Sequence, residues 1–189
     1  QERGDVRQGL KILEKAGEYA RMDDSSVVTE EHTRRATETI ETDEILNCFD
    51  NDLTRQQALT YIATTLAIIE PEHDARTKRI YQLYTSLAEA IGSETRSERK
   101  IYEFLDQLSM QGFVRSEDHN QGRGGGRRFV YEVTDDPVDI INATFKSEYQ
   151  DSLPNNIWDI LQAYKEDEAS SFEAPNPNDD TQRQIWQFT

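Results

Sequence analysis

Glycine and arginine alternate along one short stretch of the chain in a pattern that suits contact with phosphate groups. Residues 121–128 read Gln-Gly-Arg-Gly-Gly-Gly-Arg-Arg and precede the strand-like segment 129–133. Glycine lets a backbone approach a ligand closely, and arginine offers a rigid fork of donors to phosphate oxygens. The pattern predicts a β-hairpin whose tip contacts a nucleic acid. The contacting residues would be Gly122, Arg123, Gly124, Gly125, Gly126, Arg127 and Arg128.

An amphipathic helix is expected directly before this hairpin, opened by Ser93, Thr95 or Ser97. Its apolar side would consist of Ile101, Phe104, Leu105 and Leu108, and its basic side of Arg99 and Lys100, with Arg96 at its start. A helix, a strand, a basic loop and a second strand follow one another in this order in a winged helix. The helix enters the major groove of a duplex and the wing reaches the backbone or the minor groove. The alternatives are an ordinary solvated helix and a flexible solvated hairpin.

The same glycines could suggest a nucleotide-binding loop, but their context argues against one. A phosphate-binding loop follows a buried strand, opens a helix and, in nucleotide hydrolases, ends in Gly-Lys-Ser or Gly-Lys-Thr. Here the loop opens a strand, and no such ending occurs in the chain. We therefore expect no catalytic residues and no ATPase activity in this chain.

The distribution of charge singles out the same region. The chain has 21 basic and 37 acidic residues, a balance that by itself argues against a nucleic-acid partner. Residues 76–130, however, contain ten basic and seven acidic residues. An acidic surface with few lysines is found in acidic mesophilic proteins and in proteins adapted to molar salt, and we favour the second interpretation. The basic stretch is the one with the DNA-binding pattern.

The cysteine and histidine content and the hydropathy of the chain argue against a disulfide-bonded, a zinc-binding or a membrane-spanning protein. Cys48 is the only cysteine, so no internal disulfide can form and a reducing cytoplasm is the expected setting. The three histidines have no zinc-ligand spacing, so we expect no metal site. No apolar run approaches the ~20 residues of a membrane helix, and no signal peptide is evident. Because the chain lacks an initiator methionine, we expect it to be the C-terminal piece of a longer protein.

The predicted fold is mainly α. Residues 1–47 should form two helices, one capped by Asp5 and running to about Arg21, the other capped by Thr29 and running to about Leu46. Residues 52–147 should form the winged helix, with helices at 53–70, 76–91 and 97–110, the wing, and a last helix capped by Asp136 and running to about Tyr149. Residues 148–189 should form an acidic, partly disordered extension, with a helix at about 155–165.

Arg7 carries a further signal, because a cation in the first turn of a helix is mildly unfavourable unless it faces an anion. The segment Gly4-Asp5-Val6-Arg7 resembles the sensor-two motif of AAA+ ATPases, in the form found in the archaeal origin-recognition and replication-initiator family. Residues 10–20 and 28–32 resemble the end of that family's lid. The segment Arg76-Thr77-Lys78-Arg79-Ile80-Tyr81-Gln82-Leu83-Tyr84 resembles the second helix of its winged helix. The resemblance covers about residues 4–145.

This resemblance implies the end of an AAA+ lid followed by a winged helix-turn-helix domain. It implies binding to double-stranded origin DNA, and cooperation of the full-length protein with the replicative minichromosome-maintenance helicase. It places ATP and magnesium in the full-length protein, where Arg7 would contact the nucleotide phosphates. A winged-helix transcription regulator and a protein-interaction module with an acidic surface remain the alternatives. The regulator should form a dimer with an effector pocket, whereas the module should not bind duplex DNA in molar salt.

Overall fold

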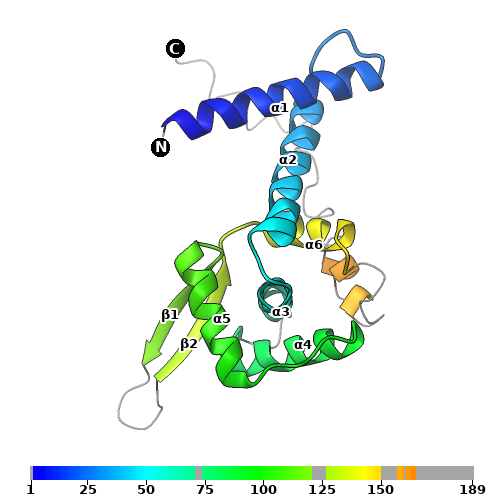
Figure 1. Cartoon of the computed structure of the whole chain (residues 1–189). Helices are drawn as coiled ribbons and strands as arrows, with labels where there is room; N and C mark the ends of the chain where they lie inside the picture. The colour runs from blue at the N-terminus through cyan, green and yellow to red at the C-terminus, as the bar shows by residue number, and fades with distance from the viewer. Residues whose placement is uncertain (1, 71–73, 121–126, 150–156, 160, 165–189) are drawn as a thin grey trace, which may run out of the picture.

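The computed structural model describes residues 2–70, 74–120, 127–149, 157–159 and 161–164. Within these residues the fold is mainly α with a two-stranded antiparallel sheet, as predicted. A helical hairpin stands at one end of the molecule and a winged helix at the other (Figure 1). In chain order the elements are α1 (Glu2–Met22), α2 (Glu30–Asn51), α3 (Arg55–Ile69), α4 (Thr77–Ala90), α5 (Glu98–Gln111), β1 (Val114–Asn120), β2 (Arg127–Val133) and α6 (Pro137–Lys146).

The helical hairpin is held by small residues and by a cation stacked on a ring. Ala16 and Ala20 of α1 are buried against α2, and the guanidinium carbon of Arg35 lies 4.4 Å from the centre of the Tyr19 ring. The predicted cap at Asp5 is wrong, because α1 already begins at Glu2 and Asp5 lies within the helix. Leu10 and Leu13 of the same helix stay more than 60% exposed. The hairpin therefore buries only part of its apolar surface.

Helix α2 begins where the sequence predicts and ends later. The Thr29 hydroxyl accepts a hydrogen bond from the backbone N–H of His32, and the His32 side chain accepts one from the Thr29 N–H. The helix continues to Asn51, past the expected end near Leu46, because Ile45 and Phe49 of its last turns are buried in the winged-helix core. One continuous helix thus joins the hairpin to the winged helix.

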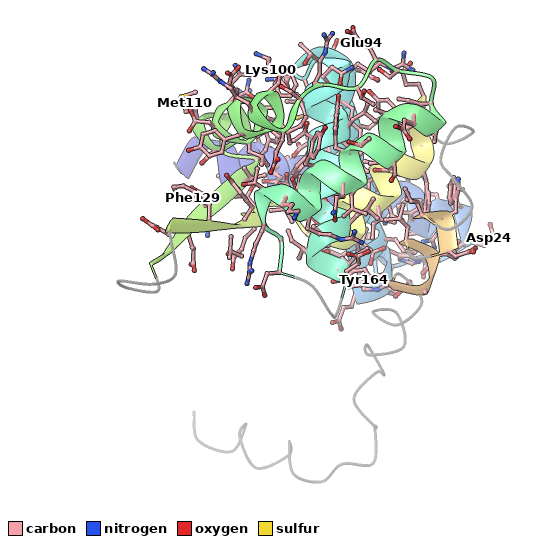
Figure 2. All side chains as sticks on the ribbon, turned by 90° about the horizontal axis from the view of Figure 1, so that it is seen from below. Asp24, Glu94, Lys100, Met110, Phe129 and Tyr164 are labelled. Carbon is pink, nitrogen blue, oxygen red and sulfur yellow. The ribbon has the colours of Figure 1, made fainter. Side chains whose placement is uncertain are left out.

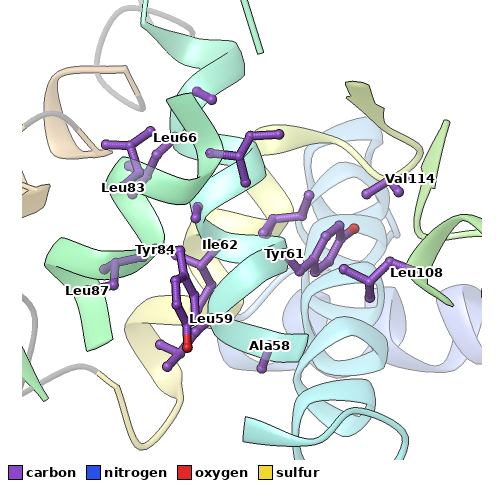
Figure 3. Packing of buried hydrophobic residues seen from close by; sticks show 14 of the residues in the cluster. Ala58, Leu59, Tyr61, Ile62, Leu66, Leu83, Tyr84, Leu87, Leu108 and Val114 are labelled. Atoms are coloured by element: carbon purple, nitrogen blue, oxygen red, sulfur yellow. The ribbon is translucent and has the colours of Figure 1, made fainter. Parts of the chain in front are cut away.

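Helix α3 forms the centre of the winged helix and is buried on nearly every side (Figure 3). Its apolar run packs against α4, α5, α6 and β2. The largest buried side chains from this and the neighbouring elements are Leu59, Tyr61, Ile62, Leu66, Ile80, Tyr84, Leu87, Ile101, Leu105, Leu108, Ile140 and Ile141. Helix α3, which at 15 residues is too short to span a membrane, is therefore a core helix. No helix in the described part of the chain could cross a bilayer.

The wing is an antiparallel pair that extends from the core. Val114 pairs with Val133 at its base, and Asn120 pairs with Arg127 at the end of the described ladder. The segment before α4 adds a contact that the sequence did not reveal, since the Tyr131 N–H donates to the Ala75 carbonyl at 2.9 Å and Arg76 bridges to Val130. Strand β2 is therefore held from both sides in its middle.

After the wing, helix α6 packs against α2. The Asp136 side chain accepts a hydrogen bond from the Val138 N–H at 2.8 Å, and Pro137 occupies the first turn, as predicted. Helix α6 ends at Lys146, before the expected Tyr149. Residues 157–159 and 161–164 are helical, and Trp158 stacks on Phe145 with ring centres 4.1 Å apart. The remaining residues of the predicted extension, 150–156, 160 and 165–189, lie outside the described residues.

Candidate nucleic-acid interface

Helix α5 is fixed in the molecule by its inner face and by both of its ends. Ile101, Leu105 and Leu108 are fully buried. Of the three predicted caps the structure uses Ser97, whose hydroxyl accepts from the Lys100 N–H at 3.4 Å. The helix stops at Gly112, whose φ of 88° is a left-handed conformation that side chains rarely adopt. The outer face is left to solvent, with Arg99, Tyr102, Asp106 and Met110 exposed.

The three basic residues predicted for this helix lie together at its N-terminal end. The Arg99 side chain is 90% exposed, and those of Arg96 and Lys100 are 43% and 42% exposed. Arg96 lies in the approach to the helix and forms an ion pair with Glu94 at 3.1 Å. In Figure 2 the labels of Lys100, Met110 and Phe129 lie on one side of the molecule, opposite those of Asp24 and Tyr164. Helix α5 and the wing thus lie on the same side of the molecule.

The predicted basic tip falls only partly within the described residues. Arg127 and Arg128 belong to strand β2, where their backbones pair with Asn120 and His119, so the expectation that they stand in the loop itself is wrong. Gly122, Arg123, Gly124, Gly125 and Gly126 lie outside the described residues. The outer half of the wing contacts α5, because Phe129 pairs with Asp118 in the ladder and its ring lies 6.2 Å from that of Tyr102. The strand that carries both arginines is therefore positioned by the helix.

Tyr84 and Gln56 hold the loop before α5, a role that the sequence did not predict for either residue. The Tyr84 hydroxyl accepts a hydrogen bond from the Arg96 N–H at 3.1 Å and donates one to the Gln56 side chain. The Gln56 amide in turn donates to the Ser93 hydroxyl at 3.0 Å and to the Glu94 carbonyl at 3.1 Å. Sequence spacing does not reveal this role, because both residues lie on helices other than α5 and pack beside an otherwise apolar core.

Replacing Tyr84 with phenylalanine should lower DNA affinity without unfolding the chain. The ring would stay buried, but the loop that presents Arg96 would lose its anchor and would have to be ordered on binding. Ordering a side chain or short loop costs roughly 0.5–1.5 kcal/mol, which corresponds to about a 2- to 10-fold weaker duplex affinity. Fluorescence titration of a labelled duplex measures this effect. The control is Tyr81→Phe on the same helix; equal affinities for both variants and the parent would contradict the proposed anchor.

Arg7, the residue expected to sense a nucleotide, lies apart from these groups. It is exposed on α1, which Figure 1 places at the end of the molecule opposite the wing. The structure therefore brings Arg96, Arg99 and Lys100 to the side of the wing and leaves Arg7 elsewhere. The described residues contain no group of three or more histidine, cysteine or acidic side chains suited to a metal ion.

Comparison with known proteins identifies both halves of the chain. The Cdc6 AAA+ ATPase-type lid domain matches residues 1–38, and the Cdc6 C-terminal winged helix domain matches residues 50–143. The ORC1-type DNA replication protein 8 of Haloarcula marismortui is 67% identical over 189 residues, which are 100% of this chain and 43% of that protein. The chain belongs to the Orc1/Cdc6 family of replication proteins. The predicted lid end and winged helix of this family are thereby confirmed.

Other members of the Orc1/Cdc6 family match over similar parts. The ORC1-type DNA replication protein 1 of Haloarcula marismortui is 37% identical over 137 residues, which are 71% of this chain and 31% of that protein. The solved structure of the Aeropyrum pernix ORC1 protein in complex with DNA aligns with a TM-score of 0.54 and 26% identity, covering 74% of this chain and 36% of that one. The chain spans less than half the length of these relatives.

In this Orc1/Cdc6 chain the lid and the winged helix meet along α2 and α6, where carboxyl groups gather. A pocket of about 540 Å³ is lined by Glu41, Glu44, Asp135, Asp136 and Asp139, among others. Asp139 is only 7% exposed, and its side chain accepts from the Thr42 hydroxyl at 3.4 Å. Burial first, and then the nearby charges of Glu41 and Asp136, raise the pKa of Asp139 to about 7. Burial also raises the pKa of Glu41.

We expect Asp139→Asn to stabilise the chain above neutral pH. A carboxyl whose folded pKa is raised favours folding fully below its unfolded pKa of ~3.9 and loses that contribution as pH rises through about 7. The parent should therefore lose roughly 2–4 kcal/mol of stability between mildly acidic and mildly alkaline pH, and the variant should lose much less. Chemical denaturation at several pH values measures this. Exposed Asp159→Asn is the control, and a variant with the parental pH dependence would contradict the assignment to Asp139.

Proposed function

We propose that this chain binds double-stranded DNA at replication origins, as the C-terminal part of a replication initiator. The observation that carries the proposal is that α5, whose N-terminal end bears the exposed Arg99 and Lys100, lies on the same side of the molecule as the wing. An exposed, basic helix end fits the major groove, while a basic hairpin beside it can follow the backbone or enter the minor groove. The DNA complex of the similar Aeropyrum pernix protein supports this proposal.

Each basic group has a distinct role in the proposed complex. Arg99, the most exposed of the three, would reach base edges, and Lys100 and Arg96 would contact flanking phosphates. Arg127 and Arg128 would contact DNA from the wing together with Arg123. Because glycine has no side chain, Gly122, Gly124, Gly125 and Gly126 would let the loop lie close to the duplex. Membership of a replication family favours this role over that of a transcription regulator.

The test is a fluorescence titration of duplex DNA in molar potassium chloride. The probes are a duplex from the replication origin of the source genome and an unrelated duplex of equal length and base composition. High salt suppresses the phosphate contribution, so that specific contacts dominate the remaining affinity. We expect the origin duplex to bind at least tenfold more tightly. Equal and weak binding of both duplexes would contradict the proposal.

For the full-length protein we propose an ATPase that loads the replicative minichromosome-maintenance helicase. Of such a nucleotide site this chain supplies only the exposed Arg7, which suits contact with nucleotide phosphates from the lid. Magnesium and ATP would supply the phosphoryl-transfer chemistry, and a phosphate-binding loop would have to come from the rest of the protein.

We therefore expect no ATP hydrolysis by the purified chain, because one arginine cannot assemble a phosphoryl-transfer site without a phosphate-binding loop. A phosphate-release assay checks this expectation. The sensitive control is Arg7→Ala, since contaminating ATPases would not respond to that change. Turnover by the purified parent that disappears in the variant would contradict this expectation.

A further inference from the structure

Glu103 lies on the outer side of α5 between the two cations that the proposed interface would use. Its carboxylate accepts a hydrogen bond from the Lys100 ammonium at 2.8 Å and lies 3.6 Å from the Arg99 Nε. The Glu103 side chain is 44% exposed, so it lies at the surface that would face DNA. The Lys100 hydrogen bond, more than any other influence, lowers the pKa of Glu103. At neutral pH the group is a carboxylate and only accepts hydrogen bonds.

A carboxylate in this position is unfavourable for general DNA binding. It repels phosphates and neutralises part of the charge of Arg99 and Lys100. Its ion pairs join residues three and four positions apart on an exposed helix, and such pairs contribute little to stability. Neither stability nor non-specific affinity therefore explains Glu103 on this face.

The edges of the bases in the major groove provide an explanation. Cytosine presents an amino group there, which donates to a carboxylate. Thymine and guanine present carbonyl oxygens, and adenine places its N7 acceptor beside its amino group, so that these three bases each repel a carboxylate. Arginine pairs with the two acceptors of guanine in the same groove. Because Arg99 and Glu103 are one helical turn apart and in contact, they would meet neighbouring base pairs together.

We infer that Glu103 is a specificity-determining residue of the DNA interface, which accepts a hydrogen bond from the amino group of a cytosine while Arg99 binds a guanine nearby. This inference rests on the proposed function, because it requires α5 to enter the major groove. Leaving one such hydrogen-bonding group unpaired in the interface weakens binding by about 5- to 150-fold, which sets the expected discrimination between bases.

The experiment is a selection of duplexes from a randomised library by the full chain in molar potassium chloride. Three chains are compared: the parent, Glu103→Gln and Asp106→Asn. Asp106 is exposed on the same helix, one turn further on, so Asp106→Asn removes an equal charge but leaves the interaction of Glu103 with Arg99 and Lys100 intact. Circular dichroism confirms that all three chains are folded.

We expect the parent and Asp106→Asn to select sites with a fixed cytosine next to a guanine. Exchanging that cytosine for thymine in the selected duplex should weaken binding of the parent by about 5- to 150-fold, and of Glu103→Gln by less than about threefold. Glu103→Gln should bind unrelated duplexes more tightly than the parent does. A cytosine preference equal in the parent and Glu103→Gln would overturn the inference alone. A parent that enriches no sequence would overturn it together with the proposed function.

Discussion

Alanine at both Arg127 and Arg128 should weaken binding of the origin duplex by roughly tenfold to a hundredfold for each arginine that reaches DNA in the parent. Both residues begin β2, whose middle is fixed by the bridge from Arg76 to Val130 and by the packing of Phe129 near Tyr102, so the fold should survive the change. In molar salt the phosphate contribution is small, and arginine inserted into a narrow minor groove would carry most of the effect of the wing. Titration of the labelled origin duplex measures the decrease in affinity.

The control for this double variant is Lys11→Ala with Arg34→Ala. Both side chains are at least half exposed on the helical hairpin, and their ion pairs join surface groups only. Arg35 would be a poorer choice, because it pairs with Asp23 at 2.8 Å and covers the Tyr19 ring. If the double variant in the wing and the double variant in the helical hairpin both bind DNA like the parent, the β-hairpin formed by β1 and β2 is not a DNA-binding wing.

The free energy of unfolding of the chain should rise strongly with salt concentration. The chain carries a net charge of −16, and two like charges ~10 Å apart in water repel by about 0.4 kcal/mol. As salt rises from ~0.1 M to ~1 M the screening length falls from ~10 Å to ~3 Å, which removes most of this repulsion between carboxylates. The free energy of unfolding should therefore increase by several kcal/mol, which corresponds to a melting temperature about 10 °C higher.

Thermal unfolding followed by circular dichroism across this range of potassium chloride checks the expected rise. Potassium acetate is a useful comparison, because it distinguishes screening by the cation from an effect of chloride. A melting temperature that is constant or falls over this range would remove the argument for adaptation to high salt. The asymmetry of charge between residues 76–130 and the rest of the chain would then need another explanation.

The parts of the fold that the sequence predicted depend on local signals. The Thr29 cap, the Asp136-Pro137 start and the apolar run of α3 are encoded by neighbouring residues, and the structure has them where expected. Helix α2 extends beyond its predicted end because Phe49 is buried by residues distant in sequence, including Tyr61 and Tyr149. Periodicity within a segment carries no information about such distant neighbours.

The candidate site also contains some features that local sequence spacing predicts and others that only the folded chain reveals. The exposed cations of α5 follow from helical spacing, and so does the burial of Ile101 and Leu105 opposite them. The anchor formed by Gln56 and Tyr84 joins α3 and α4 to the loop before α5, and only the folded chain brings these residues together. The spacing of Glu103 places it near the cations, but its simultaneous interaction with both of them depends on side-chain geometry.

Hydrogen exchange of the chain with and without the origin duplex tests most directly whether the winged helix binds DNA. We predict slower exchange on DNA binding in residues 93–111 and 114–133, and unchanged exchange in α1 and the first half of α2. The reason is that only α5, its preceding loop and the wing would contact DNA. Mass spectrometry of proteolytic fragments in molar potassium chloride resolves these segments. Protection confined to residues 2–40, with the wing and α5 unchanged, would contradict DNA binding by the winged helix.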